Sequence, residues 1–309
     1  MNQRPIMIMA GGTGGHVFPA LAIAGALRDR AQDIVWLGTR QGIEARLVPD
    51  AGINIEWISV SGLRGKGLLA RLKAPLQISR AVFESLAIIR RQRPAAVLGM
   101  GGFASGPGGL AAWLTRCPLI IHEQNAAAGL TNRLLARLAR VVLQAFPGSF
   151  NTRVAATTVG NPVRAAIAAV PPPAQRYAGR TGPLRLLVLG GSQGALSLNK
   201  TVPAALRRLP ESLQVVVRHQ CGERTFAAAR AAYADSDIDV QLLPFIDDMA
   251  EAYAWADLVV CRSGALTVAE LCAVGLPALL VPYPAAVDDH QTANAMPMAS
   301  AGAALMSPA

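Results

Sequence analysis

The sequence predicts an α/β protein made of two doubly wound domains, each with a parallel sheet packed between helices. Apolar segments typical of buried strands alternate with alanine-rich segments typical of helices. A strand that runs into a glycine-rich turn and a helix occurs twice, and the turns begin at Gly11 and Gly190, 190 − 11 = 179 residues apart. That separation is too long for a solenoid repeat and suits two domains of one architecture.

The alternation of strands and helices sets the expected elements and the domain boundary. Expected strands cover 5–10, 33–37, 53–59, 95–98, 118–121 and 140–144, and expected helices cover 17–29, 42–50, 75–92, 107–115 and 128–139. After the proline run 171–173 the alternation restarts at Leu184, so we expect domains at 1–163 and 164–309. A strand at 302–306 follows with no helix after it, so the closing C-terminal helices of such a fold are expected to be missing.

The composition limits the classes of binding partner that we expect. The net charge is +10 and the pI is near 10.3, which favours anionic partners such as nucleic acid, an acidic membrane or phosphorylated small molecules. Aromatic residues make up only 5% and are not interleaved with Arg and Lys, so nucleic acid is not expected. The four cysteines form no C-x-x-C pair, and no apolar run approaches the ~18 residues of a membrane span. We expect a protein of the cytosol or of its membrane surface.

The glycine-rich turns are the first candidate binding elements. Turns at 11–16 and 190–195 follow strands and open helices, where free backbone N–H groups suit phosphate. Neither has the dinucleotide or Walker spacing, so NAD and ATP are poorly supported. The turn at 99–109 is too rich in glycine for a passive connector, and we expect it to let a ligand or another backbone approach closely.

Polar residues after other strands are further candidates. The segment 121–125 ends a strand with four polar residues that would reach a cleft, although a satisfied hydrogen-bond network explains them equally well. Glu270, in the second turn of a helix, suits the hydroxyls of a ribose, and the alternative is a surface glutamate favoured by the helix dipole. The acidic stretch 235–239 resembles a metal-binding D-x-D pattern but indicates a solvated loop, so no metal is assigned.

Basic residues alternate with leucines between Gly62 and Lys73, a pattern that suits an anionic lipid surface. In the helix that follows, Phe83 and Leu86 are expected to face the core. The residues predicted to face the membrane are Arg64, Lys66, Leu68, Leu69, Arg71, Leu72 and Lys73.

Several motifs occur in order along nearly the whole chain. They are GGTGGHVFP (11–19), GLRGKG (62–67), HEQN (122–125), GNPVR (160–164), GGSQGA (190–195), FIDDM (245–249) and CRSGALT (261–267). Together they closely resemble the MurG family of bacterial peptidoglycan glycosyltransferases. DHQTANA (289–295) also fits, whereas the sequence from Met296 onward is less typical.

The resemblance implies a GT-B fold of two Rossmann-like domains and an inverting transfer. N-acetylglucosamine would pass from UDP-N-acetylglucosamine to the 4-hydroxyl of undecaprenyl-pyrophosphoryl-N-acetylmuramyl-pentapeptide, with a β-1,4 bond formed and with no cofactor or metal. The first domain would hold the acceptor and face the membrane, and the second would bind the UDP-sugar. The enzyme would be peripheral at the cytoplasmic face of the inner membrane and would serve cell-wall synthesis, cell shape and division, with cell-wall and division proteins as partners.

The resemblance also implies residue roles. Ile246 would read uracil through its backbone, Glu270 would bind the ribose, and Arg164 would add positive charge near the nucleotide. Asn125 and Gln291 would contact the sugar. His16 would be the base, with Glu123 in reserve, and the alternative for His16 is a structural role or a contact with the acceptor phosphate. The residues that would close the site are Thr13, Gly14 and Gly15. The residues that would cradle the diphosphate are Ser192, Ala265, Leu266, Thr267, Val268 and Ala269.

Two other functions stay open at this stage. A UDP-N-acetylglucosamine 2-epimerase would use the same fold but would need carboxylates for carbon-acid chemistry, and the basic, leucine-rich segment counts against it. A non-catalytic sugar-nucleotide-binding fragment is the third hypothesis, because the closing helices are expected to be missing.

Overall fold

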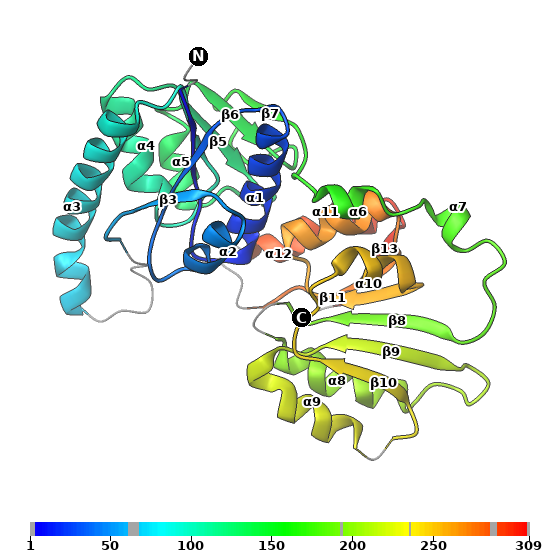
Figure 1. Ribbon diagram of the computed structural model, residues 1–309. Coiled ribbons are helices and arrows are strands. Elements are labelled where there is room, and N and C mark those ends of the chain that lie inside the picture. Colours follow the sequence, from blue (N-terminus) through cyan, green and yellow to red (C-terminus); the bar gives the residue numbers. More distant parts are fainter. Residues whose placement is uncertain (1–3, 61–67, 192–193, 235, 285–288, 308–309) are drawn as a thin grey trace. The chain divides into compact units, whose positions relative to one another are not determined.

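The computed structural model describes residues 4–60, 68–191, 194–234, 236–284 and 289–307, except that the side chains of 68–73 are not described. The chain divides into two compact units, Met1–Pro162 and Val163–Ala309 (Figure 1).

The first unit is a parallel sheet of seven strands, in the order β3-β2-β1-β4-β5-β6-β7. Its strands are β1 (Ile6–Met9), β2 (Ile34–Gly38), β3 (Asn54–Trp57), β4 (Ala96–Gly99), β5 (Leu119–Glu123), β6 (Val141–Gln144) and β7 (Ala156–Thr158). Its helices are α1 (Gly14–Arg28), α2 (Glu44–Asp50), α3 (Leu68–Gln92), α4 (Ser105–Leu114) and α5 (Leu130–Leu135).

Strand β1 shows why apolar runs form this sheet. Met7, Ile8 and Met9 are all fully buried, but alternate residues belong to different cores because strand side chains alternate between faces. Met7 and Met9 pack into one cluster with residues of α3 and α4, whereas Ile8 packs with Val17 and other residues of α1. The sheet is therefore covered on both faces, which is the predicted doubly wound arrangement.

The second unit repeats this plan with six parallel strands, in the order β10-β9-β8-β11-β12-β13. Its strands are β8 (Leu184–Leu189), β9 (Val215–Gln220), β10 (Asp239–Leu243), β11 (Leu258–Cys261), β12 (Ala278–Leu280) and β13 (Ala304–Met306). Its helices are α6 (Ala165–Ala168), α7 (Pro173–Arg176), α8 (Leu196–Leu206), the 3-10 turn η1 (Glu223–Thr225), α9 (Phe226–Tyr233), α10 (Met249–Trp255), α11 (Ala265–Val274) and α12 (His290–Ser300).

In each sheet, successive strands of the chain are added first toward one edge and then toward the other, so the strand order has one reversal point. The reversal lies between β1 and β4 in the first sheet and between β8 and β11 in the second, where Cys261 pairs with Leu189. Open parallel sheets bind ligands beyond the carboxyl ends of their strands at such a point. Residues 11–13 follow β1 and residues 100–104 follow β4, while Gly190 and Gly191 follow β8 and residues 262–264 follow β11. The predicted binding elements therefore lie where the fold favours a ligand.

Two expectations for α3 are wrong. The helix begins at Leu68 and includes Pro75, rather than beginning at Pro75. A proline inside a helix removes one backbone hydrogen bond but does not always end the helix. Phe83 is 71% exposed, because the packed face of the helix carries Ala81, Ser85, Ile88 and Ile89 instead. Leu86 does pack against the core, as expected.

No helix in the described ranges has an apolar stretch long enough to cross a bilayer. Of the residues predicted to face a membrane, Arg64 and Lys66 lie outside the described residues. The side chains of the other five, Leu68, Leu69, Arg71, Leu72 and Lys73, are likewise outside them.

Candidate active site

The two glycine turns of the first unit pack directly against each other. Gly102 has a φ of +81°, and a Cβ there would overlap the carbonyl oxygen of Gly11 and lie 2.9 Å from its carbonyl carbon. The buried Ser105 hydroxyl lies 3.0 Å from the Met9 carbonyl oxygen and 2.7 Å from that of Gly101, which ties the same turn to the end of β1. The expected close approach is confirmed, and at Gly102 the approaching group is backbone.

A buried carboxylate holds the Gly11 turn in place. Glu44 is 0% exposed, and its Oε2 accepts the Gly12 N–H at 2.9 Å. Its Oε1 accepts the Thr39 N–H at 3.1 Å and the Thr39 hydroxyl at 2.7 Å. A Cβ on Gly11 would lie 2.5 Å from Oε1, so glycine is required beside this carboxylate. Since the Gly12 N–H already binds Glu44, the turn has one N–H fewer to offer an anion.

His16 is oriented by a neighbouring amide. It lies half-buried in the first turn of α1, with Nδ1 3.3 Å from Oε1 of Gln124. The Gln124 Nε2 lies 3.4 Å from the His122 carbonyl oxygen, an acceptor, which places the amide oxygen toward His16. Nδ1 therefore carries the hydrogen and Nε2 has a lone pair. A base needs such an oriented acceptor nitrogen.

Glu123 is surrounded by donors. It is 2% exposed, and its Oε1 accepts the N–H and the Nδ2 of Asn125 at 3.0 and 3.1 Å. Its Oε2 accepts the Gly129 N–H at 3.1 Å and Asn132 Nδ2 at 2.9 Å. These bonds use all the acceptor sites of a carboxylate and leave none for a hydroxyl proton in this conformation. Glu123 instead fixes Asn125, a predicted sugar contact.

The rest of this polar segment forms the hydrogen-bond network that the sequence left open. His122 Nε2 lies 2.9 Å from the Gly160 carbonyl oxygen, and burial lowers the pKa of the His122 imidazole, although Gly160 and Glu123 raise it. Asn161 Nδ2 donates to the Gln124 carbonyl at 2.9 Å. The start of α1 keeps Thr13 and Gly15 exposed and Gly14 half-buried.

In the second unit, Glu270 lies between two partners. Its Oε1 pairs with Nη2 of Arg164 at 3.0 Å, and its Oε2 accepts the hydroxyl of Tyr253 at 2.9 Å. Burial raises the pKa of the Glu270 carboxyl, whereas Arg164 and Tyr253 lower it. Arg164 is the N-cap of α6, and α6 packs on both α10 and α11, so three elements meet at this carboxylate. The alternative, in which Glu270 is a surface glutamate favoured by the helix dipole, is therefore wrong.

The start of α11 lies beside Glu270 at the carboxyl end of β11. Gly264 is the N-cap, and Ala265, Leu266, Thr267, Val268 and Ala269 form the first turns. Ser263 is fully buried in this turn, and its Oγ has no hydrogen-bond partner among the residues that the structure describes. Its carbonyl accepts Asn294 Nδ2 at 3.2 Å. Ser192 lies outside the described residues. A ten-residue helix with an open buried hydroxyl at its start suits a phosphate group.

Two other predicted donor residues also follow strands of the second sheet. Ile246 is buried in the loop after β10. Gln291 lies in the first turn of α12, and its Oε1 accepts the Tyr283 N–H at 2.8 Å, which leaves its Nε2 as a donor.

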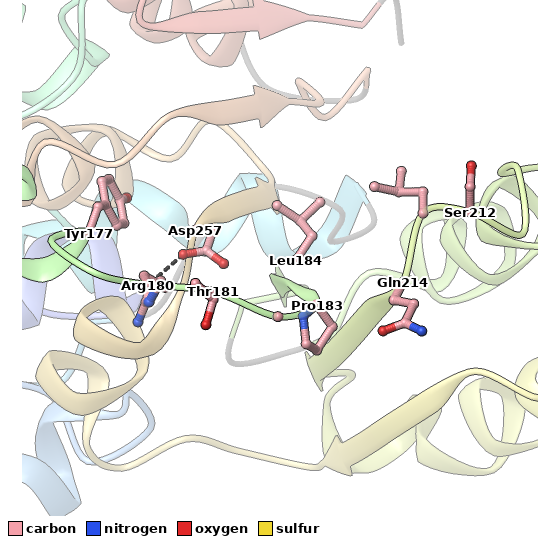
Figure 2. A pocket seen from close by; sticks show the side chains of 10 residues that line it. Tyr177, Arg180, Thr181, Pro183, Leu184, Ser212, Gln214 and Asp257 are labelled. Carbon is pink, nitrogen blue, oxygen red and sulfur yellow. Dashed lines mark hydrogen bonds and ion pairs between the residues drawn. The ribbon is translucent and has the colours of Figure 1, made fainter.

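A hollow at the opposite, amino ends of β8, β9 and β11 is a separate feature. Figure 2 shows Tyr177, Arg180 and Thr181 before β8, Gln214 before β9, and Asp257 before β11. Arg180 pairs with Asp257, and Asp257 Oδ2 also accepts the Arg185 N–H at 2.9 Å. Arg180 and the Arg185 N–H satisfy the Asp257 carboxylate at the edge opposite the one where open parallel sheets bind ligands, so we assign this group a structural role.

Sequence reasoning missed Glu44, Gln124 and Tyr253 as functional residues. Glu44 and Tyr253 lie in helical segments whose pattern reveals burial but no partner. Gln124 belongs to a motif that was noted, but its contact with His16 joins residues 108 apart.

Two doubly wound parallel sheets, one carrying a helix start suited to phosphate beside a buried glutamate, define a GT-B glycosyltransferase. Residues 6–144 match the glycosyltransferase family 28 N-terminal domain, and residues 185–309 match the family 28 C-terminal domain. The chain belongs to the MurG family within these glycosyltransferases.

Relatives and solved structures support that assignment. A UDP-N-acetylglucosamine–N-acetylmuramyl-(pentapeptide) pyrophosphoryl-undecaprenol N-acetylglucosamine transferase of Alkalilimnicola ehrlichii is 64% identical over 98% of this chain and 85% of its own length. The enzyme of the same name from Xylella fastidiosa is 58% identical over 98% of this chain and 82% of its own length. The crystal structure of Acinetobacter baumannii MurG matches with a TM-score of 0.82 and 44% identity, covering 99% of this chain and 86% of that one. A kitacinnamycin glycosyltransferase, 17% identical with a TM-score of 0.70, shows the shared fold alone.

Proposed function

We propose that this protein transfers N-acetylglucosamine from UDP-N-acetylglucosamine to the 4-hydroxyl of undecaprenyl-pyrophosphoryl-N-acetylmuramyl-pentapeptide. The transfer forms a β-1,4 bond with inversion and releases UDP. The observation that carries the proposal is Glu270, buried beside Arg164 next to the α11 start at the β8–β11 reversal. The name of the 64% identical relative supplies the two substrates.

The second unit is proposed to bind the donor. Glu270 accepts the ribose hydroxyls, the backbone of Ile246 meets uracil, and Gln291 donates to the sugar. The α11 start, Ser192 and the charge of Arg164 stabilise the diphosphate as it leaves. Since these groups supply positive potential from the protein itself, we propose that the transfer needs no metal or cofactor.

The first unit is proposed to bind the acceptor and supply the base. Thr13, Gly14 and Gly15 present the exposed part of the turn, and Asn125, fixed by Glu123, contacts the donor sugar. His16 removes the proton of the attacking hydroxyl, because Gln124 leaves its Nε2 as an acceptor.

The function is tested by incubating the protein with UDP-N-acetylglucosamine and a short-chain acceptor lipid, with and without EDTA. We expect UDP release that depends on the acceptor, a β-1,4-linked disaccharide lipid, and no loss with EDTA. An epimerase would instead give UDP-N-acetylmannosamine, or its hydrolysis products N-acetylmannosamine and UDP, without acceptor. UDP release with no disaccharide would contradict the proposed transfer.

Replacing His16 with alanine should lower kcat by roughly 10²- to 10⁴-fold, which is the usual contribution of general-base catalysis. The donor Kd should change little, because His16 is proposed to act on the acceptor hydroxyl and not on the donor. Single-turnover kinetics at saturating substrates measures this, with Gln124→Ala as a second variant that should lose part of the rate. Near-normal turnover of His16→Ala would remove His16 as the base.

We also propose that the first unit docks on an anionic membrane surface through α3 and α4. Leu76 is 75% exposed and Phe83 71% exposed, and they lie seven residues apart, so they share one side of α3 with Arg80 between them. Helix α4 packs on α3 (Figure 1) and exposes Trp113 and Leu114. Exposed apolar side chains beside Arg fit a lipid surface. Such docking is consistent with a peripheral enzyme at the cytoplasmic face of the inner membrane that serves cell-wall synthesis and division.

Replacing both Leu76 and Phe83 with serine should weaken binding to vesicles of anionic phospholipid by at least tenfold, because two apolar side chains no longer enter the lipid. Vesicle flotation measures it. Leu213→Ser removes a 46% exposed leucine of the second unit and is the matched control, with no expected effect. Equal binding of all three proteins would contradict docking through α3.

A further inference from the structure

We propose that Tyr253 is a positioning residue for recognition of the nucleotide ribose. Its hydroxyl holds the Glu270 carboxylate in the orientation that receives the two ribose hydroxyls. The inference rests on the proposed function, since it assigns Tyr253 a part in the donor site proposed above.

The contact is direct and buried. Tyr253 lies on α10 and is 1% exposed, Glu270 lies on α11 and is 4% exposed, and the hydroxyl is 2.9 Å from Oε2. Burial, followed by the nearby Glu270 charge, raises the pKa of the Tyr253 phenol well above its usual value. The hydroxyl therefore stays protonated and can only donate to the carboxylate.

The remaining capacity of the carboxylate matches a ribose. An ionised carboxylate offers about four acceptor sites. Tyr253 takes one on Oε2, and Arg164 takes one on Oε1. Within the described part of the chain, one site on each oxygen remains, which suits two neighbouring hydroxyls. Because Tyr253 and Arg164 hold opposite oxygens, they fix both the position and the tilt of the carboxylate plane.

Loss of the hydroxyl would act in two ways. Glu270 would gain freedom to rotate, and its pKa would rise further, since the Tyr253 hydrogen bond is one of the interactions that lower it. A protonated carboxyl is a poorer acceptor for ribose hydroxyls. Donor binding should then weaken, and it should begin to fail at a higher pH than in the unchanged protein.

The test compares UDP with 2′-deoxy-UDP in Tyr253→Phe, a variant that keeps the ring and removes only the oxygen. We expect the unchanged protein to prefer UDP over the deoxy analogue. In the variant the Kd for UDP should rise about tenfold, the size of one hydrogen bond to a charged group, and the preference should shrink. At saturating donor, kcat should change by less than about threefold, since the chemical groups are untouched.

Tyr233→Phe is the matched control, because it also removes a buried tyrosine hydroxyl of the second unit, one that contacts His219 rather than Glu270. It should keep the full preference for UDP. If Tyr253→Phe also keeps the preference for UDP, and its Kd for UDP rises with acid over the same pH range as in the unchanged protein, Tyr253 has no positioning role. If the unchanged protein itself binds both nucleotides equally, the assignment of Glu270 to the ribose fails instead.

Discussion

Alanine in place of Gly102 is expected to cost roughly 3 to 5 kcal/mol of folding free energy and to abolish most transfer activity. The cost combines a strained φ of +81° with a Cβ that overlaps the Gly11 carbonyl. Neither side can yield easily, because the overlap is with backbone and Glu44 and Ser105 hold the two turns. Separating the turns would also move His16, whose Nδ1 lies 2.8 Å from the Cβ position of Gly101.

Urea unfolding measures the loss of stability, and hydrogen exchange in β1 and β4 shows whether the first unit is the part affected. Gly106→Ala is the control, since its Cβ would meet only Thr131 Cγ2 at 3.7 Å and position 106 is helical. Gly25→Ala, in the last turn of α1 with nothing within 4 Å of the added Cβ, should stabilise by up to about 1 kcal/mol. A Gly102→Ala protein as stable as Gly106→Ala would contradict the close packing of the turns.

The elements that could be predicted are those that a local pattern determines. Apolar strands such as Met7–Met9, buried on both faces, and the glycine turns after them indicate the fold, because each depends on residues near in sequence. The glycine density at 99–109 indicated a close approach, but the partner, Gly11, is some 90 residues away and no pattern connects them.

The features that could not be predicted from the sequence are contacts between side chains of different elements. Glu270 was predicted to bind the ribose through the resemblance, yet its partners Tyr253 and Arg164 come from α10 and the N-cap of α6. Phe83 was expected in the core because it is large and apolar, but the helix buries its smaller Ala81 and Ser85 face. The spacing of apolar residues shows which residues share one side of a helix, whereas packing against the rest of the protein decides which side is buried.

Acid should destabilise the second unit through His219, which is expected to account for about 3 kcal/mol of stability lost between pH 6.5 and 4. Burial lowers the pKa of this imidazole from 6.5 to about 4, so the unfolded chain binds its proton at a higher pH than the folded chain does. A depressed histidine pKa leaves stability complete above 6.5 and removes it as the pH falls toward 4.

The hydrogen-bond geometry explains why the imidazole stays neutral. Asn199 Nδ2 donates to the Cys221 carbonyl at 3.0 Å, so its Oδ1, 3.0 Å from His219 Nε2, must accept. Nε2 therefore carries the only hydrogen, and Nδ1 accepts the Tyr233 hydroxyl at 3.1 Å. A second proton on Nδ1 would oppose the Tyr233 hydroxyl hydrogen in a fully buried site.

Urea unfolding at pH 7 and pH 4.5 measures the loss, and His219→Gln is the variant that removes the titrating group. Since buried His122 in the first unit has a lowered pKa as well, the informative quantity is the difference between the two proteins. The variant should be less stable at pH 7 but should lose about 2 to 3 kcal/mol less on acidification. Equal losses in both proteins would show that His219 does not titrate as proposed.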